Sequence, residues 1–242
     1  MNLTERANSG LHDSIDAKIQ SLPIGKEDSI LDVGCGTGAF LSRLALNGYK
    51  SLHGVDIALP AQPVDSVSFS ALDLDTGSIP FADGSMKLIV SIEVLEHIEN
   101  VGIFFKELSR ILDPNGYILL TTPNVHSLEA RLRFLLTGKL KQFDELSDPT
   151  HLYPVLQYPL ARLLNRHSLS VEAISGFPEN GTSPTSRSSL QLAARVLRAM
   201  GLKAFPAGDH LCLQIRRMNG NAANSYRSKS AVVTSHYGSQ IS

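Results

Sequence analysis

Apolar and polar residues alternate along the chain in blocks that predict strands and helices in turn. Five strands are predicted from short apolar runs, at residues 30–33, 52–55, 67–72, 87–92 and 117–122. Helices are predicted from apolar residues three or four positions apart, at about 11–22, 39–47 and 101–111. Two later strands are predicted at 169–173, where apolar and polar residues alternate, and at 211–217. Strands that alternate with helices favour an α/β fold, in which helices cover both faces of a parallel sheet.

The same pattern divides the chain into one domain and a tail. A chain of 242 residues, of which 43% are hydrophobic, is long enough to bury a full core. From Met218 onward the chain is rich in Asn, Ser and Gly and has no acidic residue. This predicts a domain over 1–217 and a disordered tail over 218–242. Within the domain, we expect a basic amphipathic insertion at about 127–150 and a helical lid at about 177–208.

Charge and cysteine content argue against several classes of protein. The formal charge of -1 at pH 7 gives no overall attraction to nucleic acid, which is therefore not the expected partner. Cys35 and Cys212 lie far apart in the sequence and lack the spacing of a metal or redox motif. No apolar stretch approaches the roughly 18 residues of a spanning helix, and no secretory signal is evident. We expect a soluble cytoplasmic protein.

The stretch "SILDVGCGTGAF", residues 29–40, predicts a strand, a glycine turn and the start of a helix. Such a turn lets a ligand contact bare backbone and the free N–H groups of the helix. Gly34, Gly36 and Ala39 match the pattern of dinucleotide sites, with Asp56 about 20 residues further on. However, a carboxylate at Asp32 would repel a pyrophosphate, whereas S-adenosylmethionine carries a sulfonium and an ammonium and has no phosphate. The charge pattern favours S-adenosylmethionine over a nicotinamide cofactor.

Further motifs follow at ordered intervals. They are "HGVDIA" after the second strand, "ALDLDTGSIPFADGSMKLIV" after the third, "SIEVLEHI" at the fourth and "LDPNGYILLTTPN" at the fifth. With "LDVGCGTG", this series resembles the class I S-adenosylmethionine-dependent methyltransferases, over the chain up to about residue 217. The resemblance implies a Rossmann-like three-layer sandwich, with a mostly parallel seven-stranded sheet and an antiparallel last strand. It also implies S-adenosylmethionine as the cofactor.

The resemblance assigns roles to individual residues of the cofactor site. Asp32 and the backbone of Gly34 and Gly36 would face the methionine end, and Gly38 would complete the turn. Asp56, followed by Ile57, would accept from both ribose hydroxyls, because one carboxylate has two oxygens for two adjacent donors. Asp73 would accept from the adenine amine beside the backbone of Leu74, although Asp75 is close enough to take its place. Glu93 would lie beside the sulfonium. The alternative is that Asp32 and Asp56 only cap turns or helices.

A second group of residues points to the transfer step. A hydroxyl acceptor needs its proton removed by a base, or its alkoxide stabilised by a metal. The pattern Glu93-x-x-Glu96-His97, with His151 in "DPTHLYP", looks like that of two O-methyltransferase branches. One branch acts on ubiquinone precursors and the other on the terminal ribose of small RNAs. We therefore expect Glu93, His97 and His151 to be catalytic.

The same residues also suggest a metal site. If a helical turn begins after the fourth strand, Glu93, Glu96 and His97 would share one side of it, and His151 could add a fourth ligand. Two carboxylates and two imidazoles would suit Mg²⁺, Mn²⁺, Zn²⁺ or Co²⁺. In the alternative, Glu96 and His97 brace the helix, while His97 or His151 is a base that needs no metal.

The insertion suggests the class of acceptor. Leucines recur at helical spacing in "SLEARLRFLLTGKLKQF", residues 127–143, among the cations Arg131, Arg133, Lys139 and Lys141. Either this helix docks over the sheet with its charges in water, or it lies on a membrane surface and presents a lipid-linked acceptor. The segment looks similar to that of bacterial O-methyltransferases of quinone and polysaccharide pathways.

The favoured function is therefore O-methylation of a small-molecule, lipid-linked or glycan-linked acceptor, in the cytoplasm or at the membrane periphery. The alternatives are an RNA 2′-O-methyltransferase and a regulatory protein that binds S-adenosylmethionine without catalysis. A nicotinamide oxidoreductase would share the fold. The low net charge disfavours the RNA enzyme. The presence of Glu93, Glu96, His97 and His151 disfavours the regulatory protein without catalysis.

Overall fold

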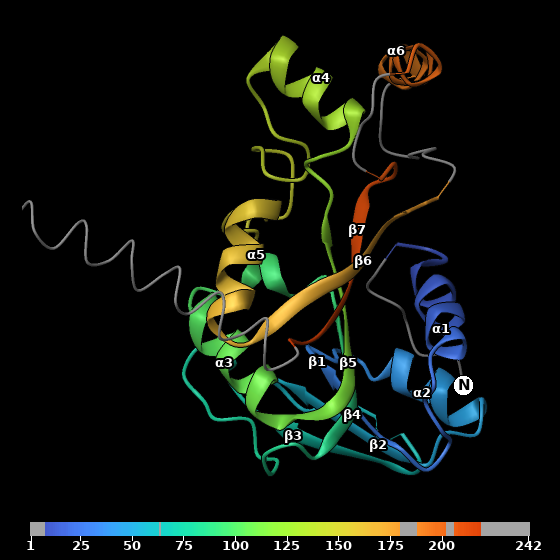
Figure 1. The fold of residues 1–242 in the computed structure, drawn as a ribbon, viewed down its shortest axis with the longest axis vertical. Coiled ribbons are helices and arrows are strands. Elements are labelled where there is room, and N and C mark those ends of the chain that lie inside the picture. The colour runs from blue at the N-terminus through green and yellow to red at the C-terminus, as the bar shows by residue number, and fades with distance from the viewer. Residues whose placement is uncertain (1–7, 63, 180–187, 202–205, 219–242) are drawn as a thin grey trace, which may run out of the picture.

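One seven-stranded sheet organises the protein (Figure 1). The structure, a computed structural model, describes residues 8–62, 64–179, 188–201 and 206–218, so most of the predicted tail and part of the predicted lid lie outside the described residues. The strands are β1 (Ser29–Val33), β2 (Ser51–Asp56), β3 (Val67–Ala71), β4 (Met86–Ile92), β5 (Leu112–Pro123), β6 (Leu169–Phe177) and β7 (His210–Arg217). Their order in the sheet is β3-β2-β1-β4-β5-β7-β6. The first five are parallel, and β7 runs antiparallel to both β5 and β6, so the predicted antiparallel last strand is confirmed.

Helices cover both faces of this sheet, which confirms the three-layer prediction. On one face lie α1 (Leu11–Ser21) and α2 (Ala39–Leu46), and on the other lie α3 (Val101–Ile111) and α5 (Gln157–Arg166). Beyond the edge where the parallel strands end, α4 (Leu128–Thr137) and α6 (Ser188–Ala199) contact each other (Figure 1). Among the described residues, no helix combines the length and apolar character needed to cross a membrane.

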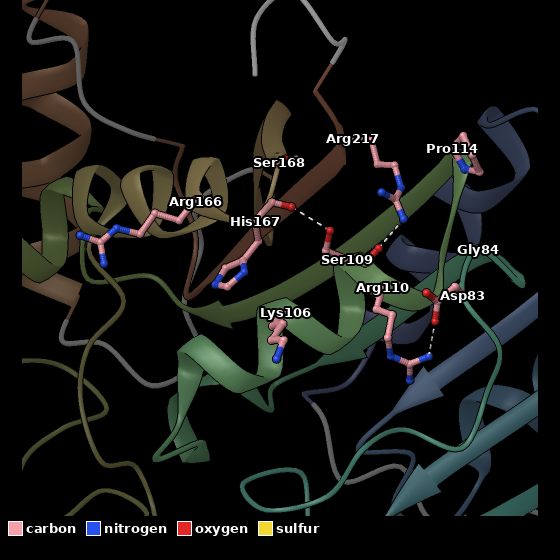
Figure 2. A pocket seen from close by; sticks show the side chains of 10 residues that line it. All are labelled: Asp83, Gly84, Lys106, Ser109, Arg110, Pro114, Arg166, His167, Ser168 and Arg217. Atoms are coloured by element: carbon pink, nitrogen blue, oxygen red, sulfur yellow. Dashed lines mark hydrogen bonds and ion pairs between the residues drawn. The ribbon is translucent and has the colours of Figure 1, made fainter. Parts of the chain in front are cut away.

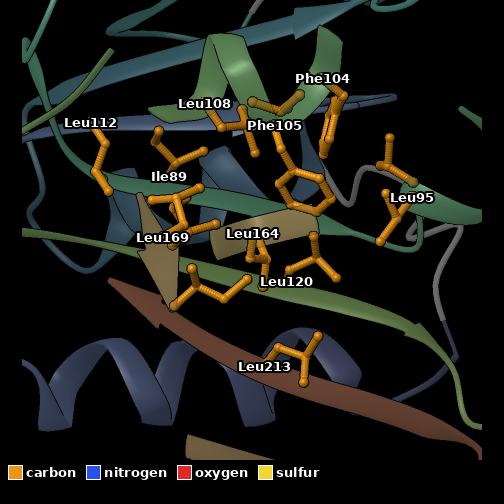
Figure 3. Packing of buried hydrophobic residues seen from close by; sticks show 14 of the residues in the cluster. Ile89, Leu95, Phe104, Phe105, Leu108, Leu112, Leu120, Leu164, Leu169 and Leu213 are labelled. Carbon is orange, nitrogen blue, oxygen red and sulfur yellow. The ribbon is translucent and has the colours of Figure 1, made fainter. Parts of the chain in front are cut away.

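Two buried apolar clusters, one on each face, hold the layers together. The cluster under α3 and α5 includes Phe104 and Phe105 of α3 and Leu164 of α5, packed against Ile89 and Leu120 of the sheet (Figure 3). The opposite cluster joins α1 and α2 to the other face. The apolar spacing assigned all of these residues except Leu164 to helix faces and strands, and each of the five is at most 1% exposed. Burial of this apolar surface is the main force that closes the sandwich.

A cavity of about 550 Å³, smaller than the one at the opposite edge of the sheet, opens at the edge where the parallel strands begin (Figure 2). Two of its three arginines, Arg110 and Arg217, have partners within the fold. Arg217 donates to the carbonyl oxygen of Leu112 at the end of α3, which lacks a partner within the helix. Arg110 pairs with Glu107 at 2.7 Å and with Asp83 at 2.9 Å. We read this basic cavity as a structural cluster that joins α3 to β5 and β7.

The insertion differs from the predicted single helix over 127–143. Helix α4 begins after Ser127, whose hydroxyl accepts from the N–H of Ala130, and ends at Gly138, which has a φ of 69°. A glycine in this left-handed conformation stops a helix, because its backbone turns the chain away from the axis. The chain then continues without a helix to α5, which the apolar spacing did not reveal.

The predicted basic surface of the insertion is also largely neutralised. Arg133 pairs with Asp144 and Lys139 with Glu145. Lys141 is buried and lies 2.6 Å from Asp209, just before β7. Of the four cations, only Arg131 has no ion pair among the described residues. The acids that follow the helix in the sequence fold back on it, and the apolar spacing of the helix gives no sign of these ion pairs.

Candidate active site

A cavity of about 1080 Å³ lies at the edge of the sheet where the parallel strands end. Ten of the sequence-predicted site residues line it: Asp32, Gly34, Gly36, Asp56, Ile57, Asp73, Leu74, Glu93, His97 and His151. Two others do not line it. Gly38 precedes the first turn of α2, and Glu96 is fully buried beside the cavity. The fold therefore brings together side chains from strand ends that are far apart in the sequence.

The glycine turn after β1 is shaped by close contact. Gly34 has a φ of +78°, and a Cβ placed there would lie 2.3 Å from Cγ2 of Val94. Only glycine fits this position without displacing Val94. The backbone N–H of Gly36 donates to Oδ2 of Asp56 at 2.7 Å, which ties the turn to the end of β2. The turn thus leaves a bare backbone wall facing the cavity.

Asp32, near the end of β1, is a buried acid that faces the cavity and is only 3% exposed. Burial, and to a smaller extent the charge of Asp56, raises the pKa of Asp32 to about 7. No hydrogen bond to its carboxylate is found among the described residues. A buried carboxylate without a partner is unfavourable unless a ligand supplies positive charge. Asp32 therefore fits a cationic ligand and does not fit a pyrophosphate.

Asp56 ends β2 and presents its carboxylate at the same cavity. Oδ1 accepts from the backbone N–H of Ile57 at 2.8 Å, and Oδ2 accepts from Gly36. Each oxygen keeps a further lone pair, so the carboxylate can still accept from two adjacent hydroxyls. Asp56 therefore caps the turn, as the alternative held, and still has acceptor capacity on the side of the cavity.

The two acids after β3 differ in what holds them. Oδ1 of Asp73 accepts from the backbone N–H of Asp75 at 2.9 Å. Oδ1 of Asp75 accepts from the backbone N–H of Asn100 at 2.6 Å, which joins it to the start of α3. Both line the cavity, together with Leu74. Because Asp75 is engaged in the link to α3, Asp73 is the better candidate for contact with an adenine ring.

Glu93 occupies the centre of the edge, directly after β4. Its φ of 54° lies in the left-handed region, which residues other than glycine adopt infrequently. Oε1 accepts from the hydroxyl of Thr121 at 2.8 Å, and Oε2 lies 2.7 Å from Nδ1 of His210. Sequence reasoning did not identify Thr121 or His210 as site residues. The only signal was their place at the ends of apolar runs, because nothing local shows which strand lies beside β5.

A cluster of possible metal ligands lies nearby. Single ligand atoms of Glu96, His97 and His151 all lie within 4.8 Å of one another. Glu93 is not in this group, so the expectation that one helical turn gathers it with the others is not met. The segment after β4 is a single 3-10 turn, Leu95–His97, and Glu93 precedes it and turns toward His210. One atom of Glu96, Oε1, is buried without a hydrogen bond.

Each of the two histidines of the cluster is oriented by a contact of its own Nδ1 with a backbone carbonyl. Nδ1 of His97 lies 3.1 Å from the carbonyl oxygen of Thr150, and Nδ1 of His151 lies 2.7 Å from that of Gln142. Because a carbonyl only accepts, each Nδ1 carries the proton and each Nε2 keeps a lone pair. Burial, and next the charge of Glu93, raises the pKa of Glu96 well above its usual range. A divalent cation would satisfy Oε1 and favour the charged form of Glu96.

Comparison with known proteins gives concordant results. A family model described as "Methyltransferase domain" matches residues 7–174. The ubiquinone biosynthesis O-methyltransferase of Arabidopsis thaliana mitochondria is 31% identical over 168 residues, which are 62% of this chain and 49% of that protein. The 2-methyl-6-phytyl-1,4-hydroquinone methyltransferase of Synechocystis is 31% identical over 113 residues, which are 44% of this chain and 35% of that protein. The matches thus span half or less of these relatives.

A solved structure agrees with the fold. The S-adenosylmethionine-dependent methyltransferase from Archaeoglobus fulgidus superposes with a TM-score of 0.58 at 19% identity. The match covers 85% of this chain and 94% of that chain. At this level of identity the likeness supports the shared architecture, and the site must be argued from its own residues.

Proposed function

Because the chain belongs to the class I S-adenosylmethionine-dependent methyltransferases, we propose that it methylates a hydroxyl oxygen of a small-molecule or lipid-linked acceptor. One observation carries the proposal. A single cavity is lined on one half by the acids Asp73, Asp56 and Asp32, and on the other half by Glu93, His97 and His151. The first half suits a cofactor with hydroxyls and a positive end. The second half suits an acceptor that must lose a proton.

The cofactor half fits S-adenosylmethionine in charge and in shape. When bound, S-adenosylmethionine supplies a methyl group on a positively charged sulfur, which is open to attack by an oxygen. Asp56 would accept from the ribose hydroxyls and Asp73 from the adenine amine. Asp32, whose carboxylate has no hydrogen-bond partner in the part of the chain that the structure describes, would face the ammonium group across the bare backbone of Gly34. Methyl transfer is a displacement in line with the sulfur, so holding both reactants in position accounts for much of the rate.

The acceptor half fits a divalent metal. Glu96, His97 and His151 would hold the ion, with both histidines binding through Nε2. When bound, the ion would lower the pKa of the acceptor hydroxyl. Mg²⁺ or Mn²⁺ suits the carboxylate and an oxygen acceptor, while Zn²⁺ or Co²⁺ suits the imidazoles. Without an ion, the same two Nε2 atoms would be free to take a proton from the hydroxyl.

The acceptor class is inferred from the cavity and from the surface beside it. The cavity, of about 1080 Å³, is at the upper end of the range for ligand sites, 300 to roughly 1,000 Å³, which leaves room for an acceptor next to the cofactor. At this end of the molecule, α4 exposes Leu135 and Leu136, and α6 exposes Leu192 and Val196. We infer that these apolar faces make peripheral contact with a membrane that holds a lipid-linked acceptor. The names of the relatives above, for ubiquinone and a hydroquinone, support a hydroxylated ring.

One incubation tests the proposed function. The protein is mixed with methyl-labelled S-adenosylmethionine and a host extract, and lipid products are separated from aqueous ones. Label that appears in either fraction only with the protein supports the proposal, and label in the lipid fraction supports a lipid-linked acceptor. Loss of labelling in excess chelator, restored by one divalent ion, supports the metal. Absence of labelled product, with the cofactor bound, would contradict the enzymatic function and favour a regulatory one.

A further inference from the structure

The polar row along the edge of the sheet continues beyond the cofactor half. Because the strand order includes β2-β1-β4-β5-β7, Asp56 and Asp32 mark one half of the edge, Glu93 the middle and His210 the far half. A cofactor that spans Asp56 and Asp32 would direct its reactive end toward Glu93. The acceptor would then lie beside Glu93 and His210, on the side away from the cofactor.

His210 is held at this position from several sides. It is the first residue of β7, opposite Pro123 of β5, and it lines the cavity although the residue is only 3% exposed. Nδ1 lies 2.7 Å from Oε2 of Glu93, and Nε2 lies 2.6 Å from the side-chain nitrogen of Asn8. The ring of Phe177 packs beside it, with centroids 6.2 Å apart. The cavity therefore receives an imidazole whose orientation is fixed.

These partners determine where the proton of the ring lies. The Glu93 carboxylate only accepts, so Nδ1 of His210 carries the proton. The Asn8 amide nitrogen donates, so Nε2 carries a lone pair. This is the arrangement in which a carboxylate holds an imidazole ready to take a proton at its other nitrogen. The other charged groups around the ring are Asp209, which precedes it and is paired with Lys141, and His12 of α1 in the cavity wall.

Glu93 is itself fixed, as a positioning residue must be. The hydroxyl of Thr121 donates to Oε1 of Glu93 at 2.8 Å, while the backbone N–H of Glu93 donates to that hydroxyl at 3.0 Å. Strained backbone of the kind seen at Glu93 persists where surrounding contacts determine it, and such positions cluster at functional sites. The strained turn here directs the carboxylate to His210.

We propose that His210 accepts the proton of the acceptor hydroxyl during methyl transfer, and that Glu93 positions its ring. The inference rests on the proposed function. The hydroxyl takes the place of the Asn8 amide at Nε2. As the new oxygen–carbon bond forms, the carbon–sulfur bond breaks and its electron pair stays on sulfur, while the hydroxyl proton moves to Nε2. The products are a methyl ether, S-adenosylhomocysteine and the imidazolium of His210, whose charge Glu93 balances. The imidazolium then releases its proton from Nε2 to water.

Two probe acceptors of different acidity test this role. Catechol needs a base for efficient transfer, whereas 4-nitrocatechol is largely ionised near neutral pH and does not. In His210→Asn, we expect kcat with catechol to fall about 100-fold, the range of general base catalysis, and kcat with 4-nitrocatechol to fall less than about tenfold. Glu93→Gln should show the same dependence on acceptor, with a smaller loss. His167→Asn is the matched control, because His167 lines the smaller cavity at the opposite edge of the sheet and not this one, and it should leave both rates unchanged.

Further measurements separate the role from misfolding and from failure of the proposed function. Each variant should remain folded with one cooperative thermal transition, the His210 variants should keep the cofactor affinity of the wild type, and added imidazole should restore part of the catechol rate to His210→Ala. Equal losses with the two acceptors in every His210 variant, without imidazole rescue, would overturn the role of His210 alone. Failure of the wild type to methylate either catechol, together with absence of labelled product in the host extract, would instead contradict the proposed function.

Discussion

Asp32 lowers the stability of the folded chain while the site is empty, and a cationic ligand would reverse this effect. It is an acid, and burial raises its pKa from 3.8 to about 7. The folded chain therefore binds a proton there that the unfolded chain has released. As pH rises from about 4 to 7, this group makes folding progressively less favourable, and the loss is complete above pH 7. A cation in the cavity would reverse the effect by stabilising the charged form.

A pH dependence of cofactor binding follows. Below about pH 7, S-adenosylmethionine must displace the proton of Asp32, so its affinity should rise with pH by up to about tenfold per unit and level off near pH 7. Equilibrium dialysis across this range measures the effect. Asp32→Asn, which has no proton to lose, is the matched variant and should flatten the curve. An equally steep curve in Asp32→Asn would assign the dependence to another group.

That Asp32, Asp56 and the glycines share one cavity could be predicted, because their signals are local. Asp32 and Asp56 each follow an apolar run and stand at a fixed distance from the glycines. His210 and Thr121 could not be predicted. Thr121 meets Glu93 because β5 pairs with β4, and His210 meets Glu93 because β7 pairs with β5, and both pairings join segments that are distant in the sequence. Which residue of the acceptor half can accept a proton can be inferred only when these strand pairings are known.

At the scale of elements, the insertion is the part that differs most from its sequence pattern. The leucine spacing predicted one long helix, but Gly138 ends α4 and the following acids pair with its cations. The strand and helix blocks of the sandwich were predictable because one apolar face repeats along each of them. The loop that carries His151 has no such repeat, and its position depends on buried polar contacts.

The buried pair of Lys141 and Asp209 is the anchor of that loop. The two charges lie 2.6 Å apart, and the neighbouring Gln142 accepts from His151 through its carbonyl oxygen. Lys141→Met would leave Asp209 as a buried charge and should lower the free energy of unfolding by about 3 to 5 kcal/mol, measured by urea denaturation. The double variant Lys141→Met with Asp209→Leu should recover only part of the loss, because the buried Glu129, 3.8 Å from Lys141, also loses its cation. If the single variant is as stable as the wild type, the pair is not the anchor.

At the scale of the whole molecule, the net charge of -1 and the pairing of the insertion cations change the expected membrane contact. The sequence suggested an attraction carried by four cations, yet only Arg131 is without an ion pair among the described residues. Because each basic residue near an anionic surface contributes about 1 kcal/mol, the electrostatic part should be small. The exposed leucines of α4 and α6 should account for most of the binding.

Vesicle sedimentation tests this account of the surface. The protein should co-sediment with anionic vesicles, and added salt should weaken the binding only about fivefold, as expected for the loss of one screened contact of about 1 kcal/mol. Leu135→Asp with Leu136→Asp should abolish sedimentation, while Leu46→Asp, an exposed leucine on α2, should not. Complete release by salt would restore the electrostatic interpretation, and no sedimentation at low salt would remove the membrane from the proposal.

The central claim is that the larger cavity binds S-adenosylmethionine, and calorimetric titration tests it most directly. We expect one S-adenosylmethionine to bind per chain, S-adenosylhomocysteine to compete, and NADH not to bind. Asp56→Ala should weaken binding by about 1.5 to 3 kcal/mol, because hydrogen bonds to a charged group are lost, while the exposed Asp65→Ala should not change it. Tight binding of NADH, or unchanged affinity for S-adenosylmethionine in a folded Asp56→Ala variant, would contradict the account.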